Sequence, residues 1–204
     1  MITLSNLTEK QLDKIVNEIT DAFYDYQYNE ADCGLVKYIK SRKSMYIYMK
    51  AIVTAAYRCN MLYTTSESQE GYLFLSGKDM GQISFCQGMK MISAEKKALG
   101  GFRNMNSFIK ACFSEGGTIE TRMRKAKRPF IRIEMLVVNK SHQKQGFMKK
   151  MLEEVYRMAE EKGVAVILDT DDKDKAARYQ HLGMKLDRVR NCGEKFHMYD
   201  LIRE

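Results

Sequence analysis

A strand, a polar loop and a helix follow one another without interruption between Phe130 and Lys162. The segment Phe130–Val138 is dense in β-branched and large apolar residues and has no glycine or proline, which is typical of a buried strand. From Met148 onward, apolar residues recur at three- and four-residue steps, which predicts an amphipathic helix that ends at Gly163. The loop 139–146 therefore opens a helix directly after a buried strand.

This loop has the features of an anion site. The first N–H groups of a helix have no intrahelical partner, and the helix dipole adds positive potential there, so a diphosphate would fit. An ordinary strand-to-helix turn, which needs no ligand, is the alternative. Three basic side chains near the loop could meet a further phosphate: Lys144, Lys149 and Lys150.

The next segment repeats the alternation of strand and helix. Residues 164–170 form another apolar run, and either Asp171 or Asp172 can cap a short helix after it. That helix ends in Tyr179-Gln-His-Leu-Gly-Met184, where Gly183 stands at the position that favours a left-handed backbone. We therefore expect two consecutive strand-and-helix units.

Together these units resemble the two acetyl-coenzyme A signatures of the GNAT acyltransferase superfamily. Gln143, Gly146 and Met148 take the marked positions of Gln/Arg-x-x-Gly-x-Gly/Ala, and Tyr179 begins Tyr-x-x-Leu-Gly. The resemblance implies the α/β (α+β) GNAT acyl-CoA N-acyltransferase fold, with a central mixed, mostly antiparallel sheet flanked by helices. With a helical insert before the central strand, the layout is also similar to the puromycin N-acetyltransferase group.

The resemblance implies an acetyl-CoA-dependent N-acetyltransferase and assigns roles to residues. The central strand is expected to splay near Val137 or Val138 and to free a backbone N–H for the thioester carbonyl. Tyr179 takes the position of the general acid. Glu134, the one acid in the strand, is the candidate base, since its alternation matches Leu136 and burial would raise its pKa. The residues expected to bind the coenzyme are Leu136, Val137, Val138, Gln143, Lys144, Gln145, Gly146, Phe147, Met148, Lys149, Asp172 and Lys175, and no metal is expected.

The remaining segments read as elements around this centre. Thr8 to Gln11 resembles a capping box that opens an apolar-faced helix. Residues 31–58 predict two further helices broken near 41–44, residues 61–65 and 71–75 predict a strand pair, and 184–202 predict two more strands. The insert, from about 80 to 127, should be helical and packed against the domain. Three tyrosines after the first helix either pack or line the acceptor pocket: Tyr24, Tyr26 and Tyr28.

Composition limits the class of protein. A chain of 204 residues with no linker-like stretch predicts one domain, 1–204. No apolar run reaches the ~20 residues of a membrane span, so no membrane partner is expected. The N-terminus lacks the basic start and apolar core of a signal peptide, so we expect a cytoplasmic protein. The five cysteines, Cys33 among them, and the three histidines are scattered, which indicates neither a disulfide framework nor a zinc site.

The net charge of +8 predicts an anionic partner. Coenzyme A is the expected one, and the basic run from Arg122 to Arg128 leaves nucleic acid as a weaker alternative. We expect the acetyl group to move to a primary amine of a small molecule. Two other readings stay open: a peptide or protein amine as acceptor, and a coenzyme A binding module without turnover. A homodimer is compatible with the sequence, which does not identify the amine.

Overall fold

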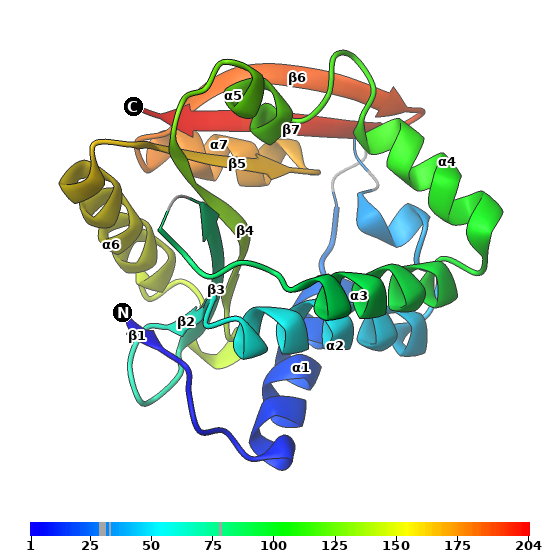
Figure 1. Ribbon diagram of the computed structural model, residues 1–204, viewed down its shortest axis with the longest axis horizontal. Coiled ribbons are helices and arrows are strands. Elements are labelled where there is room, and N and C mark those ends of the chain that lie inside the picture. The colour runs from blue at the N-terminus through cyan, green and yellow to red at the C-terminus, as the bar shows by residue number, and fades with distance from the viewer. Residues whose placement is uncertain (29–31, 33, 78) are drawn as a thin grey trace.

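A computed structural model describes residues 1–28, 32, 34–77 and 79–204, so Cys33 lies outside the described residues (Figure 1). Seven strands form one sheet in the order β1-β2-β3-β4-β5-β7-β6. Among the described strands, only β4 and β5 pair in parallel, which confirms a mixed, mostly antiparallel sheet. The strands are β1 (Ile2–Thr3), β2 (Leu62–Thr64), β3 (Gly71–Gly77), β4 (Phe130–Val138), β5 (Ala165–Thr170), β6 (Lys185–Gly193) and β7 (Phe196–Arg203).

Helices cover both faces of the sheet. They are α1 (Glu9–Tyr24), α2 (Arg42–Arg58), α3 (Phe85–Ala98), α4 (Phe102–Cys112), α5 (Ile119–Lys125), α6 (Phe147–Lys162) and α7 (Lys173–His181), with 3-10 turns η1 (Leu35–Lys37) and η2 (Lys140–His142). The capping box of α1 is confirmed, because Thr8 accepts from the Gln11 N–H and the Gln11 side chain returns to the Thr8 N–H.

One helix prediction was wrong. Of the two helices expected within residues 31–58, the second is α2, which Ser41 caps. In the described part of the first there is only the 3-10 turn Leu35–Lys37. This segment bonds outward instead, since the Leu35 N–H donates to a carboxylate oxygen of Asp171 at 2.9 Å.

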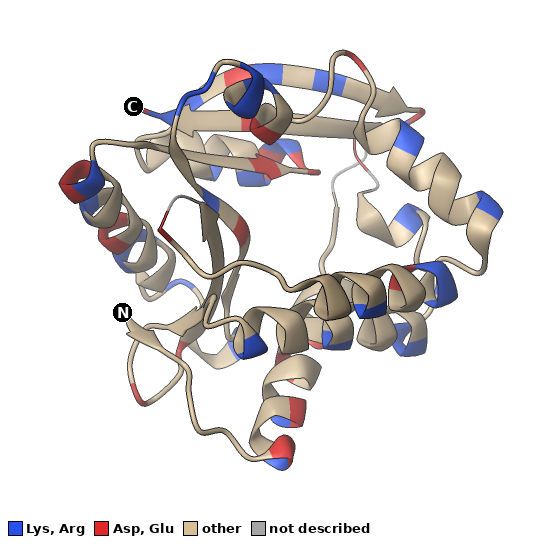
Figure 2. Cartoon of the chain, viewed as in Figure 1, with Lys and Arg blue, Asp and Glu red and all other residues tan. Residues whose placement is uncertain are grey.

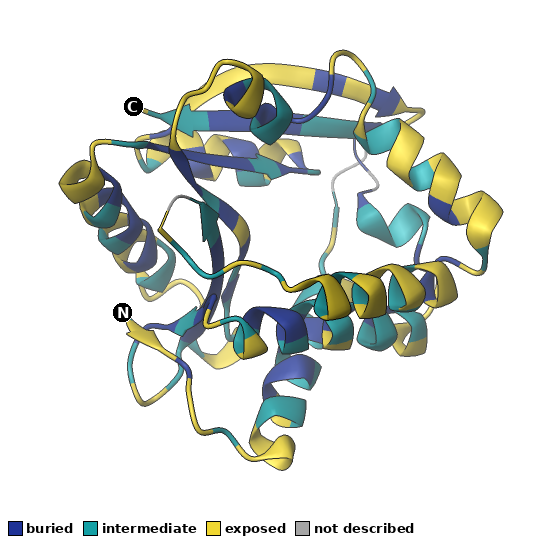
Figure 3. Ribbon diagram, viewed as in Figure 1, coloured by how far each residue is buried: buried dark blue, intermediate teal, exposed yellow. Residues whose placement is uncertain are grey.

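The two faces of the sheet have separate cores (Figure 3). On one face, β3 and β4 pack against α1 and α2 through Tyr72, Phe74, Met135 and Val137. On the other, α6 and α7 pack against the sheet in a cluster that includes Leu73, Leu75, Ile131, Ile133, Leu152 and Leu168. A smaller cluster lies under α5 and contains Ile119, Met123, Phe130 and Ile167.

The insert is helical, as predicted, and comprises α3, α4 and α5. Ala98, Leu99 and Met105 pack into the core. Met89 and Ile92, which belong to the same predicted helical pattern as Ala98 and Leu99, do not, since they are 51% and 50% exposed. The insert therefore packs against the domain with one side of each helix and leaves apolar residues on the other.

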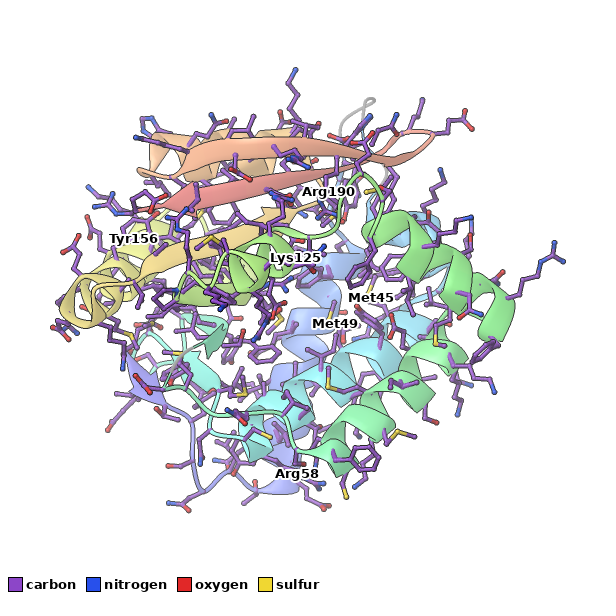
Figure 4. The ribbon with its side chains drawn as sticks, turned by 45° about the horizontal axis from the view of Figure 1, so that its top comes forward. Met45, Met49, Arg58, Lys125, Tyr156 and Arg190 are labelled. Carbon is purple, nitrogen blue, oxygen red and sulfur yellow. The ribbon has the colours of Figure 1, made fainter. Side chains whose placement is uncertain are left out.

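A buried ionic network joins the strands at the other end of the sheet. The side chain of Arg190 in β6 is fully buried and contacts Asp200 at 3.0 Å and Asp169 at 3.1 Å (Figure 4). Asp169 also accepts from Arg132 of β4 at 3.0 Å. Because an unpaired charge in the interior is costly, each member depends on its partners.

Part of the basic run from Arg122 to Arg128, which was the reason to consider nucleic acid as a partner, forms ion pairs in this region. Arg122 reaches Asp200 at 2.9 Å, Arg124 pairs with Glu120, and Arg128 pairs with Glu204. A run whose arginines are internally paired is a weaker candidate for a phosphate-binding stripe. In the part of the chain that the structure describes, no helix is long and apolar enough to cross a membrane.

Candidate active site

The loop after β4 leads into α6 through a left-handed glycine. Gly146 is the N-cap of α6 and has φ 83°, a value that residues with a Cβ rarely adopt. The first helical bond runs from the Lys150 N–H to the Gly146 carbonyl at 3.1 Å. The N–H groups of Phe147, Met148 and Lys149 consequently have no partner within the helix. Apart from its two chain neighbours, no residue has a heavy atom within 4 Å of a Cβ built on Gly146.

The other predicted loop residues lie on either side of Gly146 in the chain. Gln143, Lys144 and Gln145 are exposed. The Gln145 side chain braces the loop by donating to the Ser141 carbonyl at 2.9 Å. Met148 points the other way and packs against the core beneath α6. Lys149 is exposed and makes only a 3.7 Å ion pair with Glu153, so its charge remains accessible.

Beside the loop, β4 separates from β5 (Figure 1). The two strands pair only from Phe130 to Arg132 of β4, whereas β3 follows β4 to its end. The Asn139 N–H donates to the Glu70 carbonyl at 2.9 Å. Because antiparallel pairs alternate, the N–H of Val137 then faces β3, while the N–H groups of Leu136 and Val138 face the gap. The sequence predicted the separation but left the donor open between Val137 and Val138.

A β-bulge in β4 decides which way Glu134 points. Ile133 pairs with Leu75 and Met135 with Phe74, so Glu134 has no partner in the register. The predicted alternation of Glu134 with Leu136 was therefore wrong, because it assumed an unbroken strand. Leu136 packs on the α6 face. Glu134 shares the opposite face with Arg132, whose Nε lies 3.3 Å from its carboxylate.

The surroundings of Glu134 act on its pKa in opposite directions. Burial raises the pKa, whereas Arg132 and the Ser76 hydroxyl, which donates to the carboxylate at 2.6 Å, lower it. The net direction is upward, as the sequence predicted. A carboxylate with a raised pKa is a better proton acceptor than an ordinary glutamate.

Tyr179 lies in α7 with its ring in the core on the α6 face, where it is 9% exposed. Burial is the main cause that raises its pKa, and the nearby Tyr156 and Asp171 add to the effect. The phenol is therefore protonated at neutral pH. Among the described residues its hydroxyl has no recorded hydrogen-bond partner, which leaves the proton available to a ligand.

The N-terminus of α7 is made by a buried carboxylate. Asp172 caps the helix through the Lys175 N–H at 2.7 Å and accepts from the Tyr26 hydroxyl at 3.0 Å on the same oxygen. Its other oxygen is buried and has no partner among the described residues. A buried acceptor without a donor is costly, so this atom fits an N–H supplied by a ligand.

Lys175 is engaged by the protein itself. Its ammonium lies 3.3 Å from an oxygen of Asp171, 3.8 Å from the centre of the Tyr26 ring and 4.9 Å from that of Tyr28. These are the distances of an ion pair and of cation–π contacts. A role for Lys175 in binding the coenzyme would therefore require it to leave these contacts or to act through them.

Residues 25–28, which we call the bridging segment, span the open end of the gap. On the β4 side, Asp25 pairs with Lys140 at 3.1 Å. On the β5 side, the Tyr28 hydroxyl donates to Asp171 at 2.7 Å, next to the bond from Tyr26 to Asp172. The sequence left open whether these tyrosines pack or line a pocket, and it did not identify their partners, which lie more than a hundred residues away.

Acidic side chains also converge on the face of the sheet that carries Glu134. Burial raises the pKa of Tyr48 in α2, and the charges of Glu95, Asp171 and Glu134 raise it further. Glu95 projects from the inner side of α3, burial raises its pKa, and it has no recorded ion-pair partner among the described residues. Glu134 and Asp171 are paired with Arg132 and Lys175, so among these three acids Glu95 is the one available to attract a cation.

The solved structures that resemble this chain share its whole fold. The C-terminal condensation domain of Ebony, in complex with beta-alanyl-dopamine, matches at 11% identity and a TM-score of 0.58 over 97% of this chain and 96% of that one. A polyamine N acetyltransferase of Drosophila melanogaster matches at 12% identity and a TM-score of 0.58, over 98% of this chain and 97% of that one. A Corynebacterium glutamicum protein described as histone acetyltransferase HPA2 and related acetyltransferase matches at 12% identity and a TM-score of 0.57, over 97% of this chain and 93% of that one.

The model of the acetyltransferase (GNAT) family matches residues 106–184, which contain β4, the loop, α6, β5 and α7. The matched segment covers less than half of the chain, and the fold is that of the GNAT acetyltransferases. A further match, to nourseothricin acetyltransferase, covers 36% of this chain and 48% of that one at a TM-score of 0.32, which is too low to support an argument. The search of curated proteins found no match. The likeness to the puromycin N-acetyltransferase group stays a prediction.

A cavity of about 390 Å³ lies between α6 and the end of α7. Lys149, His181 and Arg203 line it together with Glu153 and Tyr156. Sequence reasoning missed this basic cavity, because Arg203 is far from the signatures in the chain. A second cavity, of about 260 Å³, lies at the opposite end of α6, around Gly163.

Proposed function

We propose that this protein transfers an acetyl group from acetyl-CoA directly to the primary amine of a small, cationic molecule. The observation that carries the proposal is the gap between β4 and β5, which opens beside the free N–H groups at the start of α6. An extended, amide-bearing chain that ends in a diphosphate suits this arrangement. The residues with which it would pair are Leu136, Val138 and the unpaired oxygen of Asp172.

The coenzyme would be held at both of its ends. The diphosphate accepts hydrogen bonds from the N–H groups of Phe147, Met148 and Lys149. The nucleotide lies toward the cavity that His181 lines together with Lys149 and Arg203, and the charges of Lys149 and Arg203 suit a phosphate. This placement leaves the thioester between β4 and β5.

The thioester carbonyl accepts a hydrogen bond from the N–H of Leu136 or Val138. As the amine attacks the carbonyl carbon, negative charge develops on its oxygen, and this donor stabilises it. One such donor contributes about 3 to 4 kcal/mol in comparable acyl transfers. The C–N bond forms and the C–S bond breaks, with the electron pair leaving on sulfur.

The proposed general acid, Tyr179, and the proposed general base, Glu134, lie on opposite faces of the sheet. Tyr179, on the α6 face, donates its proton to the departing thiolate. Glu134, on the face of α1 and α2, accepts one proton from the incoming ammonium, directly or through water. The nitrogen loses its second proton after the C–N bond has formed, and this proton returns through water to the Tyr179 phenolate. This division follows the bulge, which turns Glu134 away from the cluster that holds Tyr179.

The acceptor is a cation because its side of the sheet is acidic. Glu95, Asp171 and Glu134 all act on Tyr48, and Glu95 has no recorded ion-pair partner in the described part of the chain. The similar fold of an enzyme named as a polyamine N acetyltransferase makes diamines and polyamines the first compounds to test.

The experiment is a thiol-release screen with acetyl-CoA against diamines, polyamines, aminoglycosides, neutral amines and peptides. We expect turnover with small cationic amines and little with neutral ones of the same size. Turnover confined to peptides would overturn the acceptor class. Thermal stabilisation by acetyl-CoA without turnover of any amine would indicate a binding module instead.

A further inference from the structure

The helices of the insert have an apolar side that faces solvent. In α3, Phe85, Met89 and Ile92 are 83%, 51% and 50% exposed. At about 100° per residue they fall on one line along the helix, away from the inner side that carries Ala98. Single exposed apolar residues are ordinary, but an aligned set on one helix marks an interaction surface.

The next helix repeats the pattern. Phe102 and Ile109 of α4 and its C-cap residue Phe113 are 59%, 38% and 55% exposed and again fall on one line. The two lines meet at the corner between the helices, because the Lys96 ammonium of α3 lies 5.9 Å from the centre of the Phe102 ring. We call these six residues the outer face of α3 and α4.

Basic residues flank the outer face. Residues 85–113 contain five basic residues and one acid, Glu95, so their net charge is +4, half of the +8 of the whole chain. Glu95 points to the inner side, where burial raises its pKa. Figure 2 shows blue segments along both helices. The basic residues are Lys90, Lys96, Lys97, Arg103 and Lys110.

The positive charge of the outer face distinguishes between its possible binding partners, which are a second copy of the chain, an acidic peptide helix and a lipid surface. A second copy on a two-fold axis would bring the same lysines together, and like charges across an interface are unfavourable. An acidic peptide helix would need a groove, and the two cavities described above are lined by other elements. A lipid surface needs no groove and offers apolar depth beneath negative headgroups.

We propose that the outer face of α3 and α4 binds the surface of an anionic lipid bilayer. The phenylalanines enter the boundary between headgroups and acyl chains, and the lysines meet the headgroup phosphates and carboxylates. The binding is peripheral, since no described helix is long and apolar enough to span. The acidic inner side of α3 stays turned toward the acceptor site.

The test is co-sedimentation of the full chain with sonicated vesicles, either of phosphatidylcholine alone or with about 30% phosphatidylserine. We expect binding to the anionic vesicles only, weakening as salt rises from about 0.05 to 0.5 M. The triple variant Phe85→Ser, Phe102→Ser, Phe113→Ser should bind at least about tenfold more weakly, a loss of ~1.4 kcal/mol.

The matched control is Leu186→Ser, Val189→Ser, which removes two apolar residues that are 40% and 43% exposed on β6. It should bind like the wild type, and thermal melting should show that both variants are folded. Absence of wild-type binding to anionic vesicles at low salt would overturn the proposal. So would equal binding by the triple variant. A dimer in sedimentation velocity that the triple variant dissociates, without vesicle binding, would reject it in favour of self-association.

Discussion

Glu134 and Leu136 lie on opposite faces of the sheet although they stand two residues apart in one strand. The bulge opposite Phe74 and Leu75 inserts Glu134 as an extra residue, so the alternation of faces changes at that point. As a result, the carboxylate faces the acceptor side while Leu136 packs under α6.

The first prediction concerns Glu134 and pH. If Glu134 is the base, it must be ionised, so turnover should fall as pH falls through its raised pKa, which lies above the ordinary value of about 4.3. Glu134→Gln should lower kcat by ~10² to 10⁴ and remove this acidic limb. Glu67→Gln, in an exposed turn, is the control. A pH–rate profile in which the variant keeps both the limb and the rate would contradict the role.

The second prediction separates catalysis from packing at Tyr179. Tyr179→Phe keeps the buried ring but removes the proton donor, so kcat should fall by ~10² or more while acetyl-CoA affinity changes little. Tyr57→Phe is the control, because its hydroxyl accepts from the Leu7 N–H at 2.8 Å and lies outside the proposed chemistry and the coenzyme site. Equal turnover by both folded variants would show that Tyr179 is structural.

The third prediction compares two left-handed glycines on α6. Gly146 has φ 83° and Gly163 has φ 62°, and a Cβ at either meets nothing within 4 Å. Alanine at either position should cost about 1 to 2 kcal/mol of stability through backbone strain. Only Gly146→Ala should weaken acetyl-CoA binding in calorimetry. Equal affinity in the two variants would mean that the loop does not hold the diphosphate.

The fourth prediction concerns the acceptor. Glu95→Gln removes a half-buried charge from the inner side of α3, so KM for a cationic amine should rise by about tenfold, or ~1.4 kcal/mol. KM for acetyl-CoA should stay the same, since the proposed coenzyme contacts lie on other elements. Steady-state kinetics with each substrate varied will test this, again with Glu67→Gln as control. An equal rise in both KM values would indicate a general distortion instead.

The fifth prediction concerns stability. Arg190→Ala removes the fully buried partner of Asp200 and Asp169, which leaves them only Arg122 and Arg132, and should cost ~3 kcal/mol. For a chain of this size each kcal/mol lowers Tm by roughly 2 to 4 °C. Arg188→Ala, whose exposed side chain bonds the Glu115 carbonyl, should change Tm little. Similar melting of the two variants would show that the network contributes little.

The sequence by itself determined the elements around the centre. Phe130–Val138 is the central strand, and the helix that follows it ends before Gly163, as predicted. The capping box at Thr8 was also predicted correctly, and Asp172 is the cap among the two candidates that the sequence left open, Asp171 and Asp172. These features depend on local periodicity and on side-chain bonds to nearby backbone, which residues close in the chain specify.

Only the tertiary structure decided how these elements meet. The face of Glu134 depends on a bulge, which arises between two strands and leaves no mark in the alternation of one strand. The contacts of Tyr26 with Asp172 and of Tyr28 with Asp171 join segments more than a hundred residues apart. The exposure of Met89 and Ile92 follows from which side of α3 faces the domain, because a helix with apolar residues on two sides does not reveal which of them is buried.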